Sequence, residues 1–236
     1  MQKDIKDLIE TKIQSLFDKL AKKKFDPIFT KNQNKLRSIL HTATIKHGHV
    51  LEAAYLNAVK LEKKEFKVWC EPEFCISEEA HNKSNNQTSQ RILESTEPYG
   101  ECMLVRKKPR KVQVDMIVYD HINEEVSAYE IKRGGVYHDS GKKKTIIADV
   151  IAVQVLLKDY AKQKNLKVKK TNSLIISHYG ATLTTKDWKN LQINGDKIDE
   201  HFSAKISKHL KEAQDYWIKC FKPKYSEMIN KLADEL

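Results

Sequence analysis

The sequence predicts an α/β protein, with strands in the middle of the chain and helices towards both ends. Three observations carry this prediction. Apolar residues recur every three or four positions near both ends, as on one face of an amphipathic helix. β-branched and aromatic residues concentrate in short central runs, which is typical of strands. A long apolar helical stretch follows these runs and precedes another strand-like run.

Two helical patterns open the chain. Ile5 to Leu20 carries one apolar face, and this helix should end near Lys24. After a turn at Pro27, a second helical pattern runs from about Gln33 to Leu61, with Gly48 as a candidate break.

Strands are predicted in the middle of the chain. Phe66 to Cys70 and Met103 to Arg106 are two short candidates, and the polar segment from His81 to Gln90 between them is expected to be a mobile, turn-rich excursion. Val112 to Tyr119 and Val126 to Arg133 are rich in β-branched and aromatic residues and are joined by the polar stretch DHINEE. These two runs predict a β-hairpin.

The remainder of the chain is predicted to be mostly helical. Ile146 to Ala161 is apolar nearly all the way round, which is typical of a buried helix. Leu174 to Tyr179 is the next predicted strand. Two final helices are expected, from about 198 to 221 and from 225 to 236, because Pro223 should separate them.

Composition indicates an ordered globular chain with a basic surface. Of the 236 residues, 40% are apolar and only 7 are glycine and 5 proline, so a hydrophobic core is expected. We expect a single domain over residues 1–236, with a core at about 33–180 and helical additions at 1–24 and 198–236. The net charge of +11 and the pI near 9.3 favour double-stranded DNA as the partner. A lysine-rich composition without nucleic-acid binding is the alternative.

The sequence lacks the marks of membrane, secreted and ATP-hydrolysing proteins. The N-terminus carries charges in place of an apolar leader, and no apolar window is long enough to span a membrane, so we expect a cytoplasmic protein without membrane contact. The four cysteines are expected to be free thiols, and the spacing of Cys70, Cys75, His81 and Cys102 does not favour a zinc site. No GxxxxGK(S/T) loop occurs, so no use of ATP is expected.

The predicted hairpin brings acidic and basic side chains to one face. If Asp120 pairs with Glu125 across a four-residue turn, Asp115 lies opposite Glu130. Lys132 points to the same side as Glu130, because side chains two residues apart on a strand share a face. Two carboxylates at cross-strand distance repel each other, and a divalent cation would remove this conflict.

Such a patch suits phosphodiester hydrolysis. Mg²⁺ prefers carboxylate and water oxygens, and its usual protein sites supply only one or two carboxylates. A metal held there can polarise a phosphoryl oxygen and activate water, while a nearby lysine can orient that water or stabilise developing charge. The alternative is a structural cluster of ion pairs on an exposed sheet face, which uses the same residue types.

The spacing and the order of elements resemble the PD-(D/E)XK nuclease family. Asp115 is followed after 14 residues by Glu130-Ile131-Lys132, on a hairpin that follows a helix and a strand and precedes a buried helix and another strand. The family core has the order αβββαβ, with its motif on the second and third strands. The resemblance covers roughly Gln33 to Tyr179. It implies a restriction endonuclease-like core, with a central mixed β-sheet flanked by helices and extra N- and C-terminal helices.

The resemblance also implies roles for the motif residues. Asp115 and Glu130 would be metal ligands together with the backbone carbonyl of Ile131, and Lys132 would assist the nucleophilic water. The metal would be Mg²⁺, with Mn²⁺ able to substitute. Many members of the family add a glutamate from the first core helix, and Glu52 is the matching candidate here, with a solvated helix position as the alternative. The chain departs from the family motif in one place, because valine precedes the aspartate where the family has proline.

The activity implied by this resemblance is that of a type II restriction enzyme. Such an enzyme is a sequence-specific double-strand DNA endonuclease that leaves 5′-phosphate ends, and a two-fold symmetric recognition site favours a homodimer. One alternative is a structure-specific or repair nuclease, or a nuclease subunit of a larger complex. Another is a DNA-binding protein on a nuclease fold that does not cut.

Basic residues are expected to border the cleft on both sides of the motif. They would contact phosphates, or else form an ordinary solvated face. His138, in the loop at 134–144, is a candidate DNA contact or a simple turn contact. Gln154 is the lone polar residue in the stretch VIAVQVLL and would either face the cleft or hold a core carbonyl. The predicted phosphate-contacting residues are Lys107, Lys108, Arg110, Lys111, Arg133, Lys142, Lys143 and Lys144.

Overall fold

The computed structural model describes residues 1–18, 26–86, 94–134, 139–184 and 186–233. The chain forms two compact units. One consists of residues 1–54 and 208–236, and the other of residues 55–207. Among the described residues, no helix is long and apolar enough to cross a membrane.

The first unit is built from helices. It holds α1 (Lys3–Asp18), most of α2 (Lys31–Glu62) and most of α6 (Ile206–Ala233). The predicted apolar face of α1 supplies Ile9, Ile13 and Leu16 to the core, where all three are at most 2% exposed. On α6, Trp217 is also buried and meets the edge of the His47 ring of α2, with 5.3 Å between ring centroids. The predicted end of the first helix near Lys24 lies outside the described residues.

Two predicted helix breaks are wrong. The helix α2 continues through Gly48, and α6 is one helix through Pro223 where two were expected. Packing on both sides explains this outcome, because tertiary contacts override the local cost of glycine and proline in a helix. Val50 and His47 are buried on either side of Gly48. Aromatic rings flank the proline in a stacked row, with 6.2 Å between the centroids of Trp217 and Phe221 and 5.3 Å between those of Phe221 and Tyr225.

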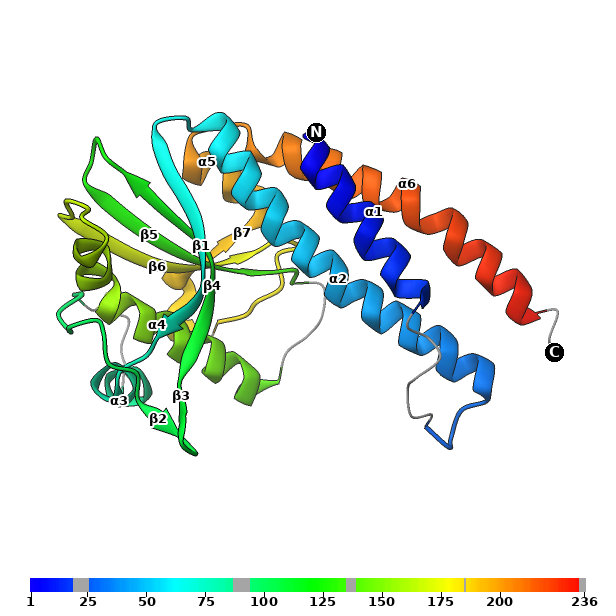
Figure 1. Ribbon diagram of the computed structural model, residues 1–236, viewed down its shortest axis with the longest axis horizontal. Coiled ribbons are helices and arrows are strands. Elements are labelled where there is room, and N and C mark those ends of the chain that lie inside the picture. Colours follow the sequence, from blue (N-terminus) through cyan, green and yellow to red (C-terminus); the bar gives the residue numbers. More distant parts are fainter. Residues whose placement is uncertain (19–25, 87–93, 135–138, 185, 234–236) are drawn as a thin grey trace. The chain divides into compact units, whose positions relative to one another are not determined.

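The second unit contains the sheet, and it confirms the α/β class with a mixed sheet flanked by helices. Among the described residues this sheet has five strands in the order β1-β4-β5-β6-β7 (Figure 1). The pairs β1·β4 and β4·β5 are antiparallel, whereas β5·β6 and β6·β7 are parallel. The strands are β1 (Phe66–Cys75), β4 (Lys111–Asp120), β5 (Glu125–Lys132), β6 (Lys170–Ser177) and β7 (Gln192–Asn194).

Short helices and one long helix accompany this sheet. The long one is α4 (Ser140–Gln163), which contains the predicted buried helix and starts six residues earlier. The short ones are α3 (Glu78–Asn86), α5 (Ile198–Phe202) and the 3₁₀ turns η2 (Lys186–Leu191) and η3 (Gly195–Lys197).

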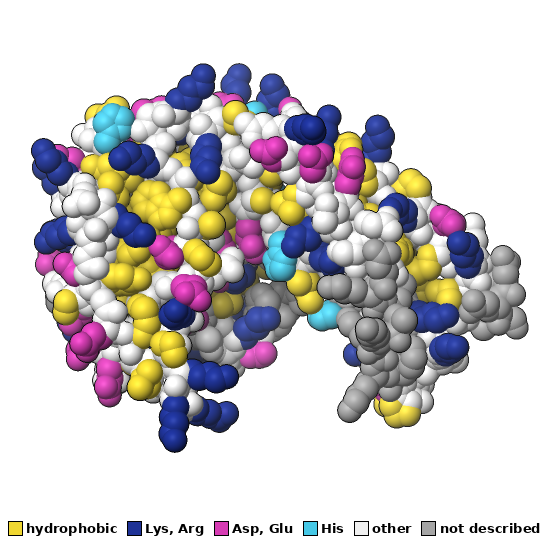
Figure 2. Space-filling view, in the orientation of Figure 1, with side chains coloured by type: hydrophobic (Ala, Val, Ile, Leu, Met, Phe, Trp, Pro, Cys, Tyr) yellow, Lys and Arg dark blue, Asp and Glu magenta, His cyan; other side chains and the backbone are white. Residues whose placement is uncertain are grey.

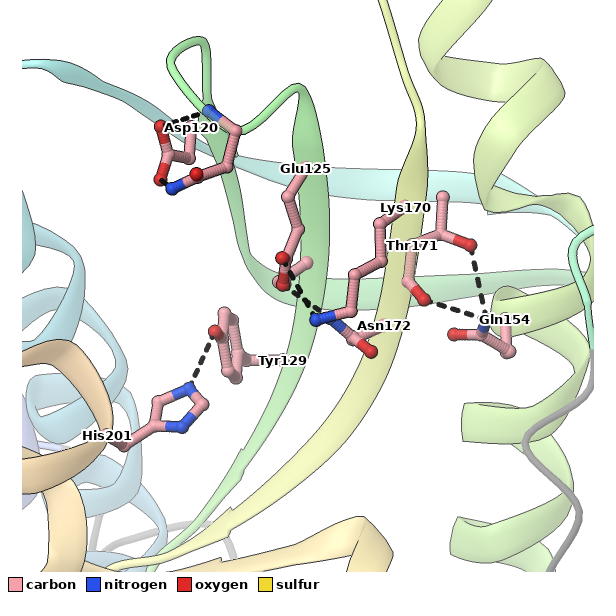
Figure 3. Close-up of polar contacts among 10 residues, drawn as sticks. Asp120, Glu125, Tyr129, Gln154, Lys170, Thr171, Asn172 and His201 are labelled. Atoms are coloured by element: carbon pink, nitrogen blue, oxygen red, sulfur yellow. Dashed lines mark hydrogen bonds and ion pairs between the residues drawn. The ribbon is translucent and has the colours of Figure 1, made fainter.

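The β4–β5 hairpin has the predicted register. Asp120 pairs with Glu125, and the ladder continues to Met116 opposite Tyr129. The Asp120 carboxylate holds the turn, because it accepts hydrogen bonds from the backbone N–H of Ile122 at 2.9 Å and from the side-chain amide of Asn123 at 2.6 Å (Figure 3). This pairing sets which side chains share a face along the whole hairpin.

One face of the hairpin packs on α4. Ile117 and Tyr119 of β4, with Val126 and Ala128 of β5, belong to the same core cluster as the α4 residues from Ala152 to Ala161. Side chains alternate along each strand, so Asp115, Glu130 and Lys132 point to the α4 side as well. On the other face, the hydroxyl of the buried Tyr129 lies 2.9 Å from Nε2 of His201 (Figure 3).

The region between β1 and β4 differs from its prediction. Residues 81–86 belong to α3, so the expected mobile excursion is wrong there, while residues 87–90 lie outside the described part. The hydroxyl of Ser77 accepts a hydrogen bond from the backbone N–H of Ala80 at 3.2 Å, which satisfies a free donor in the first turn. Ala80 and Ser84 are buried, so packing compensates for the poor helix propensity of the segment.

The predicted strand at Met103 to Arg106 does not join the central sheet. Leu104–Val105 forms β2, which pairs only with β3 (Lys108–Pro109) in a small separate hairpin. A disulfide joins Cys75 at the end of β1 to Cys102 just before β2. The expectation of free thiols is therefore wrong for these two cysteines and holds for Cys70 and Cys220.

Candidate active site

The carboxylate of Asp115 is buried and held by hydrogen bonds. The residue is 6% exposed, and its Oδ2 accepts a hydrogen bond from the backbone N–H of Ile131 at 2.7 Å. Its Oδ1 accepts another from the side-chain amide of Gln113 at 2.8 Å. A short bond from a backbone donor to a charged oxygen is among the stronger hydrogen bonds in proteins. The Asp115 side chain is therefore fixed beside the Glu130-Ile131-Lys132 segment, as the predicted register requires.

Glu130 and Lys132 form an ion pair on the same strand. Their side chains are only 24% and 31% exposed, so both are partly withdrawn from water. Burial raises the pKa of Glu130 to about 7, and the negative charge of Asp115 acts in the same direction. The positive charge of Lys132 opposes this rise without cancelling it. The structure thus brings together Asp115, Glu130 and Lys132, with two carboxylates close enough to repel each other.

A third acidic group approaches from α4. The charge of Asp149 also raises the pKa of Glu130, and its carboxylate Oδ1 lies 2.7 Å from Nη2 of Arg110. Arg110 also contacts Nδ1 of His81. Burial and the charge of Arg110 lower the pKa of His81. This cluster, made of His81, Arg110 and Asp149, borders the site on the α4 side.

Sequence reasoning missed three residues of this environment: Gln113, His81 and Asp149. Asp149 carried a signal, because it is the one acidic residue in the apolar stretch IIADVIAVQVLL, and a buried or half-buried acid needs a partner. Neither Gln113 nor His81 carried one. Gln113 is a polar residue near the end of a strand, and the contact of His81 with Arg110 spans 29 residues.

The donor set fits a hard divalent cation. Among the described residues no three His, Cys, Asp or Glu side chains gather in a geometry that could hold a metal ion. The donors that the structure brings together in this region are the carboxylates of Asp115 and Glu130. Mg²⁺ commonly takes one or two protein carboxylates and completes its shell with water and substrate oxygens. Burial and the charge of Asp115 both disfavour the ionised form of Glu130, and a cation would stabilise that form.

The basic residues that precede β4 have different surroundings. Lys107 and Lys108 are exposed in the β2–β3 hairpin. Arg110 is the only one of the group whose described contacts reach the site, through Asp149. Lys111 points to Glu73, with 2.8 Å between Nζ and Oε2.

The basic residues after β5 also need one correction. Lys142, Lys143 and Lys144 lie in the first turns of α4 and not in a loop. Asp139 starts this helix, since its carboxylate accepts a hydrogen bond from the backbone N–H of Lys142 at 2.9 Å. The guanidinium of Arg133 lies over the ring of Tyr179, 5.2 Å from its centroid. The prediction for His138 falls outside the described residues.

Gln154 belongs to the core and not to the cluster around Glu130. Its side-chain amide donates to the backbone carbonyl of Thr171 at 3.1 Å and lies 3.2 Å from the Thr171 hydroxyl (Figure 3). Thr171 pairs with Val126, at the opposite end of β5 from Glu130. The alternative in which Gln154 holds a core carbonyl is the one that the structure shows.

Glu52 lies in a different unit from Asp115, Glu130 and Lys132. It is half-buried on α2 within the first unit, whereas the Asp115 cluster belongs to the second. Its catalytic role stays a prediction. Comparison of the chain with protein-family models, with curated proteins and with solved structures gave no match.

Proposed function

We propose that this protein is a Mg²⁺-dependent DNA endonuclease of the PD-(D/E)XK kind, with Asp115, Glu130 and Lys132 as its catalytic residues. One observation carries the proposal. Two partly or fully buried carboxylates and an ammonium lie together on the α4 face of the β4–β5 hairpin, where a bound divalent cation would relieve the repulsion between the two ionised carboxylates. A purely structural cluster gains nothing from burying two like charges side by side.

The order of elements supports the same proposal. Along the chain, α2, β1, β4, β5, α4 and β6 follow one another as helix, three strands, helix and strand, with α3, β2 and β3 inserted after the first strand. This is the order αβββαβ of the family that the motif resembles. The motif residues lie on the second and third of these strands, as in that family.

The chain's own residues have distinct parts in the proposed reaction. Asp115 and Glu130 would hold Mg²⁺ together with the carbonyl of Ile131. When bound, Mg²⁺ polarises a phosphoryl oxygen and makes water a better nucleophile at neutral pH. Lys132, beside Glu130, would orient the attacking water and stabilise negative charge on the phosphorus centre. The water loses a proton as its oxygen forms a bond to phosphorus, and the P–O3′ bond breaks as the 3′ oxygen takes up a proton, which leaves a 5′-phosphate and a 3′-hydroxyl.

The proposed substrate is double-stranded DNA cut at specific sequences. The net charge of +11 favours a polyanion, and the exposed Lys142 and Lys144 in the first two turns of α4 follow the strand that carries Glu130. Cleavage of both strands at a symmetric site would require a homodimer, which we include in the proposal.

The test is incubation of the purified protein with supercoiled plasmid in Mg²⁺, in Mn²⁺ and in EDTA. Discrete linear bands in either metal and none in EDTA are expected. Glu130→Gln and Lys132→Ala should abolish cutting. Glu125→Gln is the matched control, because Glu125 lies on the same strand but pairs with Lys170 at the far end, 3.1 Å away (Figure 3).

Three outcomes would contradict the proposal in different ways. Normal cutting by Glu130→Gln would remove the assigned site. Binding of plasmid without cutting in either metal would favour the non-cutting DNA-binding alternative. Cleavage confined to flaps, forks or damaged duplexes would keep the nuclease and replace the restriction activity with a structure-specific one.

A further inference from the structure

The β2–β3 hairpin is an exposed basic ribbon that leads into the strand of Asp115. Its strands pair Leu104 with Pro109 and Val105 with Lys108, which leaves Arg106 and Lys107 as a two-residue turn. All six residues are exposed, and Leu104 keeps 68% of its surface in water. In Figure 2, Lys and Arg side chains project at the lower tip of the second unit, where Figure 1 draws β2 and β3.

The base of the ribbon is fixed firmly to the sheet. The Cys75–Cys102 disulfide ties it to the end of β1. The backbone N–H of Met103 donates to the carbonyl of Ile76 at 2.9 Å, and the N–H of Arg110 donates to the carbonyl of Met103 at 2.8 Å. These contacts fix the orientation of the ribbon relative to the sheet, although each of its strands is only two residues long.

The turn uses residues that its backbone does not favour. Arg106 and Lys107 have φ values of 50° and 67°, as in a type I′ turn, where asparagine and glycine are the preferred residues. A non-glycine residue in this left-handed region carries strain. Two long cationic side chains are therefore kept at the tip against the local preference of the backbone, which points to a use for them.

The residue that follows the ribbon connects it to the candidate site. Arg110 follows β3 directly and precedes β4, the strand of Asp115. Its guanidinium binds Asp149, whose charge acts on Glu130. A polyanion lying along the ribbon would thus continue past Arg110 towards the two carboxylates.

We infer that the β2–β3 hairpin enters the major groove of duplex DNA and positions it for cleavage, an inference that rests on the proposed function. The major groove is about 12 Å wide and admits a two-stranded β-ribbon. Arg106 contacts base edges, because a guanidinium can bind guanine in a bidentate manner. Lys107 and Lys108 contact phosphates, and Leu104 and Val105 offer apolar contacts to thymine methyl groups.

The positive φ values allow a variant that removes the tip charges without harming the turn. Arg106→Asn combined with Lys107→Gly installs the residues that this turn prefers, so the melting temperature should stay equal or rise. Binding of a fluorescent duplex is measured by anisotropy over a salt series, in the Glu130→Gln background so that no cleavage occurs. We expect at least a tenfold weaker affinity and a salt slope smaller by about one to two.

The matched control removes two lysines elsewhere on the second unit. Lys162→Gln with Lys167→Gln changes the net charge by the same amount, at the C-terminal end of α4 and in the following loop, where both residues are exposed. This control should bind within about twofold of the parent. If both variants weaken DNA binding equally, the loss follows from net charge alone and the inference is wrong.

A second arm tests base contact separately from charge. Arg106→Lys keeps the charge but loses the bidentate fork, so the salt slope should persist while preference within a randomised duplex pool relaxes. An unchanged sequence preference would contradict the proposal that Arg106 contacts base edges.

The two proposals fail in distinguishable ways. If the wild type does not cut DNA but the tip variant loses binding, the proposed contact with the major groove is supported and the proposed nuclease activity is contradicted. If the wild type cuts and the tip variant binds and cuts equally well, only the hairpin inference is wrong. No binding of duplex by the Glu130→Gln chain would also overturn it.

Discussion

Replacing Glu130 by glutamine should stabilise the folded protein at neutral and alkaline pH in the absence of metal. The substitution keeps the shape of the side chain and an oxygen that accepts a hydrogen bond from Lys132. It removes a charge that lies partly buried beside Asp115. A site selected for binding a cation is expected to be destabilising while that cation is absent.

The size of the effect follows from the pKa of Glu130. Its rise from the ordinary 4.5 to about 7 corresponds to about 3 kcal/mol of unfavourable interaction for the ionised form. The side chain is 24% exposed and glutamine loses part of the attraction to Lys132, so we expect a gain of about 1–3 kcal/mol.

Proton linkage determines whether the free energy of unfolding rises or falls with pH. Between about pH 4.5 and pH 7 the folded state holds the Glu130 proton more tightly than the unfolded chain does. The free energy of unfolding of the wild type therefore falls as pH rises through this window, and the loss is complete above it. Glutamine does not titrate, so the difference between variant and wild type grows over the same interval.

The assay is urea unfolding of both proteins in EDTA at several pH values from 5 to 8. The variant should match the wild type near pH 5 and exceed it at pH 8. Glu125→Gln, on the same strand, should not gain stability at pH 8, because it loses the ion pair with Lys170. A wild type as stable as Glu130→Gln at pH 8 would refute the reasoning that burial and the charge of Asp115 disfavour the ionised form of Glu130.

Three further predictions concern other parts of the second unit. Mg²⁺ at millimolar concentration should raise the melting temperature of the wild type but not of Asp115→Asn, as measured by differential scanning fluorimetry, and equal shifts would argue against a metal site. Cys102→Ser should lower the free energy of unfolding by about 2–4 kcal/mol and speed tryptic cleavage in the β2–β3 turn, whereas Cys70→Ser should do neither. Asp139→Ala should lower the urea midpoint of unfolding through loss of the α4 cap, and an unchanged midpoint would contradict its capping role.

The β4–β5 hairpin could be predicted because its determinants are local. Alternation of apolar residues fixes the face of each strand, and the polar stretch from Asp120 to Glu125 fixes the turn. These two facts are sufficient to place Asp115 opposite Glu130. The structure has that register.

Elements that depend on distant contacts could not be predicted in the same way. The segment of α3 is rich in serine and asparagine, and it is helical because Ala80 and Ser84 are buried against the rest of the unit. The strand β7 is three residues long and has no periodicity to detect. The contact of Arg110 with Asp149 spans 39 residues, so no local sequence pattern predicts it.

The β4–β5 hairpin also has a consequence for the order of folding. The hydrogen bond between Asp115 and Ile131 closes a loop of only 16 residues, whereas the parallel pairing of β5 with β6 joins residues 45 apart, as in the ion pair of Glu125 and Lys170. Short loops close with a smaller loss of chain entropy than long ones, and hairpins form within microseconds. The acidic pair can therefore assemble before the parallel half of the sheet. Its geometry depends on a local part of the sheet that can form early, and mutations in β6 should slow folding without changing how Asp115 faces Glu130.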